Sequence, residues 1–217
     1  MILAILAACQ NLRALACHLA PLEILRGSTE PFPPWLLSLH LELTEYMGIT
    51  WHDTPTKWTR LELSTHGTAF LHNITRLRLP CHIPFDESFP AQHLPRLTHL
   101  AMGSATQWSR SPVEYATYLR DFARFLEPVW ALTSLQLAVL VFRPRSRWSF
   151  HPPPSEAWQT RELVQAARKC GPSIFACCLS DRRFRESMFW DKCVTEGEDI
   201  WTLAQKQASL FDSVTED

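Results

Sequence analysis

Cysteine and histidine are the residue types in this chain that most readily do chemistry, and their spacing limits which chemistry is open to them. The 217 residues include seven Cys and nine His, and two pairs are adjacent, Cys17-His18 and Cys81-His82. A zinc site needs spaced ligands such as Cys-x-x-Cys, because two side chains must reach one tetrahedral ion. Neighbouring residues of a strand point to opposite faces, so each adjacent pair offers one ligand to a given site. We therefore predict no metal and no cofactor.

The sequence also lacks the patterns of nucleophilic catalysis. It has no Gly-x-Ser-x-Gly elbow, and Cys177-Cys178 lies in an apolar run that is typical of a buried core. Six Gly leave no glycine-rich loop of the kinds that hold phosphate or dinucleotides. We predict that the protein is not an enzyme and takes no small-molecule substrate.

Nucleic-acid binding has one cue in the sequence. Arg143, Arg145 and Arg147 precede the aromatic residues Trp148 and Phe150, and cations beside aromatic rings are the chemistry that binds single strands. The formal net charge of the chain is −1, which gives no general attraction for a polyanion. The sequence therefore favours a solvated loop here over a nucleic-acid interface.

The first residues bear on the compartment. The chain begins MILAILAACQ, in which Leu6-Ala7-Ala8-Cys9 resembles a bacterial lipobox. No Lys or Arg precedes this apolar run, so the positively charged start of an export signal is missing. An odd number of Cys without regular spacing favours free thiols in a reducing compartment. We predict an intracellular protein, cytoplasmic or nuclear, without a membrane span, in which the glycosylation sequon Asn73-Ile74-Thr75 is a chance match.

A repeated apolar pattern must position whatever the chain binds. Six segments share the pattern apolar-x-x-Leu-x-apolar, and successive starts are 24, 22, 16, 23 and 35 residues apart. They are residues 12–17, 36–41, 58–63, 74–79, 97–102 and 132–137. Their Leu-x-Leu cores have the period of half-buried strands, and spacings near 23 fall in the length class of leucine-rich repeats. We predict an α/β fold, an irregular leucine-rich-repeat-like solenoid of short parallel strands and short helices with a C-terminal helical cap.

Helices are expected between and after these segments. Ser111-Pro112 has the form of an N-cap and first helical position, and Pro128 should end that helix. Ser155 should cap a helix to about Lys169, the apolar run 174–179 should form a strand, and a last helix should span about 198–211. The inward stripe of the last helix is Ile200, Trp201, Ala204, Ala208 and Phe211. We divide the chain into a repeat array over 1–142, an Arg/Pro-rich loop over 143–154 and a helix-strand-helix cap over 155–217.

The C-terminal part resembles the tail of a known group of proteins. The segments Asp181-Arg182-Arg183-Phe184, Phe189-Trp190-Asp191 and Gly197-Glu198-Asp199-Ile200-Trp201 carry the resemblance, with Leu94-Pro95-Arg96-Leu97-Thr98-His99-Leu100 from the repeats. They are similar to segments of mushroom-fungus (agaricomycete) proteins that are F-box-associated or leucine-rich-repeat-like and mostly uncharacterised. The resemblance covers about residues 12–207. It implies non-catalytic protein recognition, as the substrate-recognition part of an F-box-type ubiquitin ligase adaptor.

Three departures from the expected patterns matter. The N-terminal F-box helices are absent, and Arg185-Glu186-Ser187-Met188 stands where the group has an apolar strand. Well-formed leucine-rich repeats place an Asn after each strand, but this chain has two Asn in total, Asn11 and Asn73. An asparagine ladder therefore cannot form, which is why we expect an irregular solenoid.

Protein binding has the best physical case among these functions. In a stacked repeat array, the outward positions of neighbouring strands form one continuous surface. Those positions are polar and of mixed sign here, and they define the predicted protein-binding face: His40, Glu42, Arg60, Glu62, Arg76, Arg78, His99 and Gln136. The alternative is a truncated or decayed paralogue with no independent function, an idea motivated by the abrupt start of the array at Met1.

Overall fold

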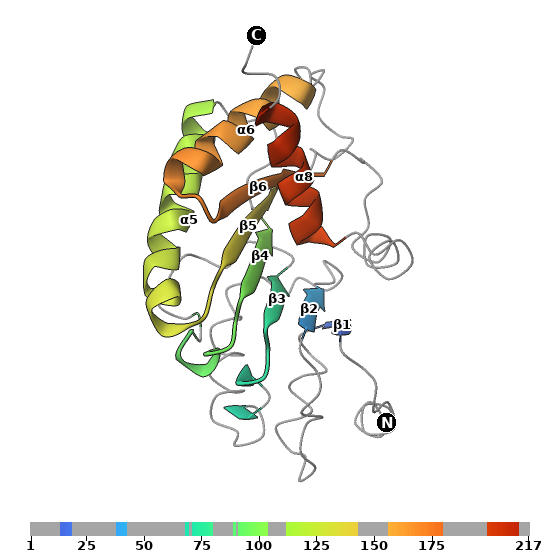
Figure 1. The fold of residues 1–217 in the computed structure, drawn as a ribbon, viewed down its shortest axis with the longest axis vertical. Helices are drawn as coiled ribbons and strands as arrows, with labels where there is room; N and C mark the ends of the chain where they lie inside the picture. The colour runs from blue at the N-terminus through green and yellow to red at the C-terminus, as the bar shows by residue number, and fades with distance from the viewer. Residues whose placement is uncertain are drawn as a thin grey trace, which may run out of the picture. The chain divides into compact units, whose positions relative to one another are not determined.

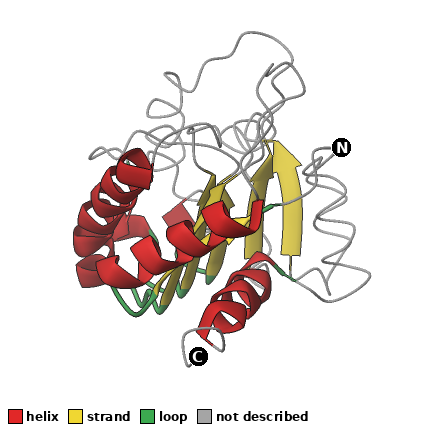
Figure 2. Cartoon of the chain, turned by 90° about the horizontal axis from the view of Figure 1, so that it is seen from above, coloured by secondary structure: helices red, strands yellow, loops and turns green. Residues whose placement is uncertain are grey.

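The computed structural model describes residues 14–18, 38–42, 68–69, 71–79, 89, 91–103, 112–142, 156–179 and 199–212, the first two ranges as backbone only. These residues form helices and parallel strands, an α/β arrangement (Figures 1 and 2). The chain divides into two compact units. Unit 1 contains residues 1–100 and 127–135, and unit 2 contains residues 101–126 and 136–217.

Parallel strands in register form one part of unit 1. Strands β1 (Ala14–His18), β2 (Ser38–Glu42) and β3 (Arg76–Leu79) follow one another in chain order. The register pairs Ala14 with Ser38 and Ser38 with Arg76, and two residues further it pairs His40 with Arg78. Positions that share a register row share a face of the sheet.

Strand β4 (His99–Gly103) begins beside β3. The backbone N–H groups of Thr98 and His99 both donate to the carbonyl oxygen of Thr75, at 2.8 and 3.0 Å. In unit 1 the strand order is therefore β1, β2, β3 and the first residues of β4. A short 3-10 helix, η3 (Ala91–His93), precedes β4.

The strands follow the phase of the repeated pattern. β1, β2, β3 and β4 each begin at the third residue of one of the apolar-x-x-Leu-x-apolar segments, those that start at 12, 36, 74 and 97. The prediction of short parallel strands in these segments is confirmed. The segment 58–63 lies outside the described residues. The leucine-rich-repeat solenoid itself stays a prediction.

Two segments with a 23-residue offset have matching local structure, and we call residues 68–79 repeat A and residues 91–102 repeat B. The N–H of Ile74 donates to the carbonyl of Leu71 at 3.1 Å, and the N–H of Leu97 donates to that of Leu94 at 3.0 Å. Four apolar positions are almost fully buried in both repeats: Leu71 and Leu94, Ile74 and Leu97, Leu77 and Leu100, Leu79 and Met102. The sequence period therefore corresponds to a recurring turn and a recurring core.

Unit 2 contains a sheet region that is covered on both faces. Strands β5 (Leu137–Phe142) and β6 (Ile174–Cys178) are parallel, with register from Ala138–Ile174 to Phe142–Cys178. The strand order in this unit is the remainder of β4, then β5, then β6. Every residue of β5 is buried, as expected for a parallel strand with both faces covered.

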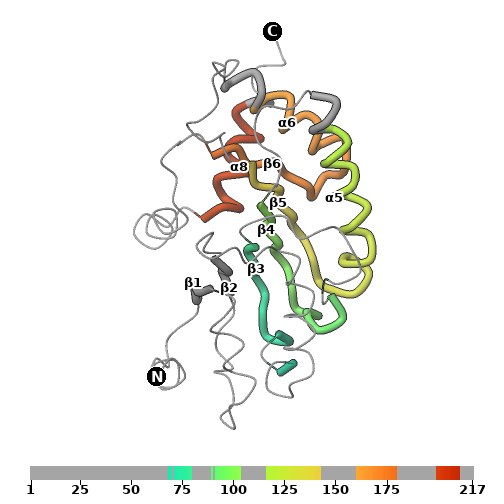
Figure 3. Tube along the Cα trace, turned by 180° about the vertical axis from the view of Figure 1, so that it is seen from behind, coloured from blue at the N-terminus to red at the C-terminus, as the bar shows by residue number. Residues whose placement is uncertain are grey.

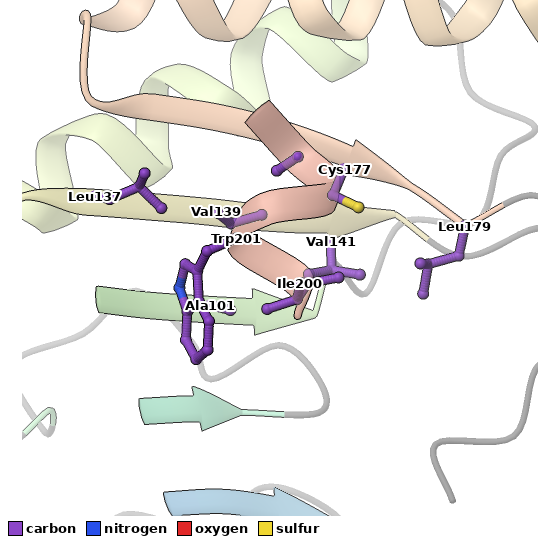
Figure 4. Packing of buried hydrophobic residues seen from close by; sticks show 9 residues of the cluster. Ala101, Leu137, Val139, Val141, Cys177, Leu179, Ile200 and Trp201 are labelled. Carbon is purple, nitrogen blue, oxygen red and sulfur yellow. The ribbon is translucent and has the colours of Figure 1, made fainter. Parts of the chain in front are cut away.

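Two helices of unit 2 pack on opposite faces of β6. Helix α6 (Glu156–Cys170) brings Thr160 to the Cys178 side chain, whereas α8 (Ile200–Asp212) packs against Cys177. Consecutive strand residues point to opposite faces, so α6 and α8 lie on different sides. The apolar cluster under α8 is Ala101, Leu137, Val139, Val141, Cys177, Leu179, Ile200, Trp201 and Ala204 (Figure 4).

Helix α5 (Pro112–Leu132) corrects one sequence prediction. Leu119, Phe122 and Leu126 form the buried stripe that was expected, but the helix does not end at Pro128. Proline in a helix interior costs about 3 kcal/mol, because it lacks an N–H and its ring clashes with the preceding turn. Pro128 is exposed and the next residue, Val129, is buried, so continued burial of the apolar stripe offsets that cost.

The end of α5 corrects a second prediction. The segment 132–137 was expected to form a strand, but α5 takes Leu132 and leads through residues 133–136 into β5 (Figure 3). The Thr133 hydroxyl donates to the carbonyl of Val129 at 2.7 Å and accepts the N–H of Leu135 at 3.2 Å. These bonds satisfy backbone groups at the helix end, and the strand starts later, at Leu137.

The C-terminal elements agree with the sequence predictions. Helix α6 ends before Gly171, strand β6 occupies the apolar run, and α8 buries Ile200, Trp201, Ala204 and Ala208. Asp199 caps α8, because its Oδ1 accepts the N–H of Thr202 at 2.8 Å. The side chain of Phe211 lies outside the described set.

Candidate protein-recognition surface

Polar contacts within unit 1 join repeats A and B at the starts of their strands. The Thr98 hydroxyl donates to the carbonyl oxygen of Thr75 at 2.9 Å and lies 2.9 Å from Nδ1 of His99. Thr75 and Thr98 are 23 residues apart and occupy the same position of repeats A and B. The contact therefore pairs equivalent positions of consecutive repeats.

A second contact of the same kind lies nearer the surface. Nη1 of Arg96 donates to Oδ1 of Asn73 at 3.4 Å, and Nδ2 of Asn73 donates to the carbonyl of Ala69 at 3.2 Å. Asn73 and Arg96 are also equivalent positions of the two repeats. The asparagine of the sequon thus has both ends of its amide engaged, and the following residue, Ile74, is fully buried.

The polar contacts extend to the residues after α5. The Ser134 hydroxyl donates to the carbonyl oxygen of Pro95 at 3.0 Å. We define the strand-start surface as Asn73, Arg76, Arg96, His99 and Ser134. All five residues belong to unit 1; Arg76, Arg96 and Ser134 are exposed, and Asn73 and His99 are half-buried.

The structure places the residues of the predicted protein-binding face unevenly. Arg76 is exposed at the start of β3, His99 is half-buried at the start of β4, and Gln136 is exposed in the loop before β5, in unit 2. His40 and Glu42 lie on β2, of which the backbone is described, and the register pairs His40 with Arg78. Arg60 and Glu62 lie outside the described residues.

Arg78 differs most from the expectation, because it is 3% exposed rather than outward-facing in solvent. The equivalent position of repeat B is Ala101, which is fully buried in the cluster beneath α8. The alternation of strand residues puts both positions on the face opposite the Leu-x-Leu core. It could not show that this face is covered, since covering depends on elements distant in the sequence.

Two cysteine thiols of unit 2, Cys170 and Cys178, have raised pKa values. Burial raises the pKa of Cys178 from its ordinary value of 9.0 to about 12, and a hydrogen bond with Thr160 opposes that shift. Burial also raises the pKa of Cys170, an effect that the nearby Arg120 guanidinium partly offsets. Both thiols are therefore protonated at neutral pH, whereas a nucleophilic or metal-binding cysteine needs the thiolate.

No group of three His, Cys, Asp or Glu side chains that could hold a metal ion occurs within the described ranges. None of the helices that the structure describes is long and apolar enough to span a membrane.

Comparisons with known proteins assign no family to this chain. No family model, no curated protein and no solved structure matches the chain.

Three residues with specific contacts were missed by the sequence analysis. Asn73 and Arg96 could have been found, because each directly precedes the first apolar residue of its segment, with the 23-residue offset. Gln207 of α8 could not, although it bonds the backbone of Cys178 in β6. It flanks the apolar stripe of α8, and no local pattern distinguishes it from other polar helix residues.

Proposed function

We propose that the protein is a non-catalytic protein-recognition module that binds its partner through the strand-start surface of unit 1. The observation that carries this proposal is the recurrence of polar residues, each exposed or half-buried, at equivalent strand starts of repeats A and B. Stacked repeats present such positions as one surface, and surfaces of this kind are widely used for protein recognition. A leucine-rich-repeat-like solenoid and a role as the recognition part of an F-box-type adaptor belong to the same proposal.

The charges of the surface indicate the chemistry of the partner. Arg76 and Arg96 are both exposed, and a guanidinium group offers forked donors that match a carboxylate. The hydrogen bond with Asn73 orients Arg96 before any partner arrives, which lowers the entropy lost on binding. The partner is therefore expected to present an acidic segment.

Charge reversal of the two exposed arginines tests the proposal. The double variant Arg76→Glu, Arg96→Glu should lose at least about tenfold in partner binding, since two attractive contacts become repulsive. Arg78 is left unchanged, because reversing the charge of a buried side chain would disturb folding rather than recognition. The measurement is quantitative affinity capture with the full chain, followed by binding titration of the captured proteins.

The matched control is Arg124→Glu. Arg124 lies on α5 in unit 2 with 71% of its side chain exposed, and its 3.9 Å contact with Asp121 is a weak surface pair. Partners that bind the double variant and the control equally well would rule out the strand-start surface as the binding site. A wild-type chain that gives no cooperative melt would instead favour the decayed-paralogue alternative.

A further inference from the structure

The outer edge of strand β6 is a surface of unit 2 that is separate from the strand-start surface of unit 1. β6 is last in the strand order of the described residues, so one of its edges meets no further strand there. Such an edge presents backbone N–H and C=O groups that can pair with a strand of another chain. Edges of this kind are normally protected, and the contacts around β6 show how this one is protected.

The hydrogen bonds to β5 fix which residues of β6 face outward. Ala138 donates to the carbonyl of Ser173 at 2.9 Å, and Leu179 donates to the carbonyl of Phe142 at 3.0 Å. Backbone groups of a strand alternate between its two edges, so odd-numbered residues of this segment face β5. Ile174, Ala176 and Cys178 therefore direct their N–H and C=O groups to the outer edge.

The side-chain amide of Gln207 occupies this edge at Cys178. Its Oε1 accepts the N–H of Cys178 at 2.9 Å, and its Nε2 donates to the carbonyl of Cys178 at 2.8 Å. One primary amide thus makes both bonds that a neighbouring strand would make at that residue. At the other end of the edge, the N–H of Ile174 is taken by the carbonyl of Gly171 at 3.2 Å.

Other contacts hold α8 where Gln207 can reach the edge. Ile200, Trp201 and Ala204 pack into the cluster over β5 and β6 (Figure 4). Nη2 of Arg168 in α6 donates to the carbonyl of Ala208, the residue after Gln207, at 2.6 Å. The amide is therefore positioned by burial on one side and by a charged hydrogen bond on the other.

We propose that Gln207 blocks head-to-tail association, in which β6 of one molecule would pair with β1 of a second copy of this chain. The pairs β1 with β2, β2 with β3 and β5 with β6 are all parallel. β1 is first in the strand order and β6 is last, so pairing β6 with β1 of another copy would continue the same parallel sequence. A head-to-tail contact joins different surfaces of the two copies, and it generates an open assembly unless the rotation between copies closes a ring.

The experiment compares Gln207→Ala with Gln205→Ala in the full chain. Gln205 is an exposed residue of the same helix, so its variant controls for the change in composition and helix propensity. Removing the Gln207 amide should accelerate hydrogen exchange of the Cys178 amide by about tenfold. It should also produce species whose mass, by light scattering, keeps growing with concentration, whereas Gln205→Ala should behave as the wild-type chain does.

The possible outcomes separate the proposal from its competitors. A Gln207→Ala variant that shows no association, or no faster exchange at Cys178, would overturn it. Association that stops at a dimer would also overturn it, because a closed pair is not head-to-tail. Tryptophan fluorescence, to which the buried Trp201 contributes with the other eight Trp, reports whether the fold persists. If the alanine variant unfolds, Gln207→Met keeps the length of the side chain without its amide, and the same two measurements decide.

Discussion

Arg78 and Ala101 occupy the same position of repeats A and B, and both are buried, but the two positions have opposite chemistry. Ala101 lies in an apolar cluster with Val139 and Trp201, whereas Arg78 brings a guanidinium group into the interior of unit 1. The starts of the two repeats are joined by polar contacts such as that between Thr98 and Thr75. Repetition in the sequence therefore fixes the backbone path and the Leu-x-Leu core, while the opposite face is used differently in each repeat.

This difference shows how one chain combines specialised regions. Unit 2 covers both faces of its strands with helices, and its described interior is dominated by apolar side chains. Unit 1 has exposed cations at its strand starts and a cation inside. A covered sheet serves stability, whereas exposed polar residues on a rigid scaffold are suited to recognition.

Ala101→Arg would give repeat B the residue of repeat A and should have the largest effect. The new guanidinium would lie within the cluster beneath Trp201, and an uncompensated buried charge is among the most destabilising changes in proteins. We expect a loss of at least about 4 kcal/mol in the free energy of unfolding, measured by urea denaturation. Ala131→Arg, at an exposed position of α5, should change it by less than about 0.5 kcal/mol. Equal stability of the two variants would show that the cluster tolerates a cation.

Alkaline pH should lower the free energy of unfolding, because the buried Cys178 thiol resists ionisation in the folded chain. Its folded-state pKa of about 12 exceeds the ordinary 9.0, so the unfolded chain releases this proton first. The contribution of the protonated Cys178 thiol to the free energy of unfolding is fully present below pH 9. It is lost between about pH 9 and 12, with a slope near 1.4 kcal/mol per pH unit. The difference in unfolding free energy between the wild-type chain and Cys178→Ala, measured across this range, should show that slope. A pH-independent difference would contradict the burial of the thiol.

Thr98→Val removes the hydroxyl that bonds Thr75 while keeping the shape of the side chain. The half-buried contact joins equivalent strand starts, and its loss should cost about 1 kcal/mol in unfolding free energy. Thr98→Ser retains the hydroxyl and should recover part of that stability. If the two variants were equally destabilised, the methyl group rather than the hydrogen bond would account for the effect.

Asn73→Ala should have the smallest effect on stability. Its bond from Arg96 is long and exposed, so we expect a loss of about 0.5 kcal/mol. Partner binding should nevertheless weaken, because Arg96 would lose the contact that orients it. Thermal melts and binding titrations of the same variant separate the two effects. A variant that binds the partner with unchanged affinity would show that Arg96 needs no orientation by Asn73.

Much of the fold followed from local patterns, and the errors arose where distant elements compete. The phase of the strands at 14, 38, 76 and 99 came directly from the repeated Leu-x-Leu cores. Pro128 was misjudged because helix length there is decided by the burial of Phe125 and Val129, which a local rule for proline does not include. The predicted face was misjudged at Arg78 for a similar reason, since alternation gives the direction of a side chain but not what covers it.

The same turn and the same buried apolar positions recur after 23 residues, so a segment of 23 residues is the unit by which the repeat array can lengthen. Thr75 and Thr98 are partners that differ by one whole unit, and the bond runs from a hydroxyl to a backbone carbonyl, so a duplicated unit would bring its own partner for this contact. An insertion of one extra residue into a strand would instead reverse the direction of the side chains that follow it. Insertions and deletions that preserve this structure are therefore expected to comprise whole repeat units. They are also expected in connections such as residues 133–136, which are not part of a strand.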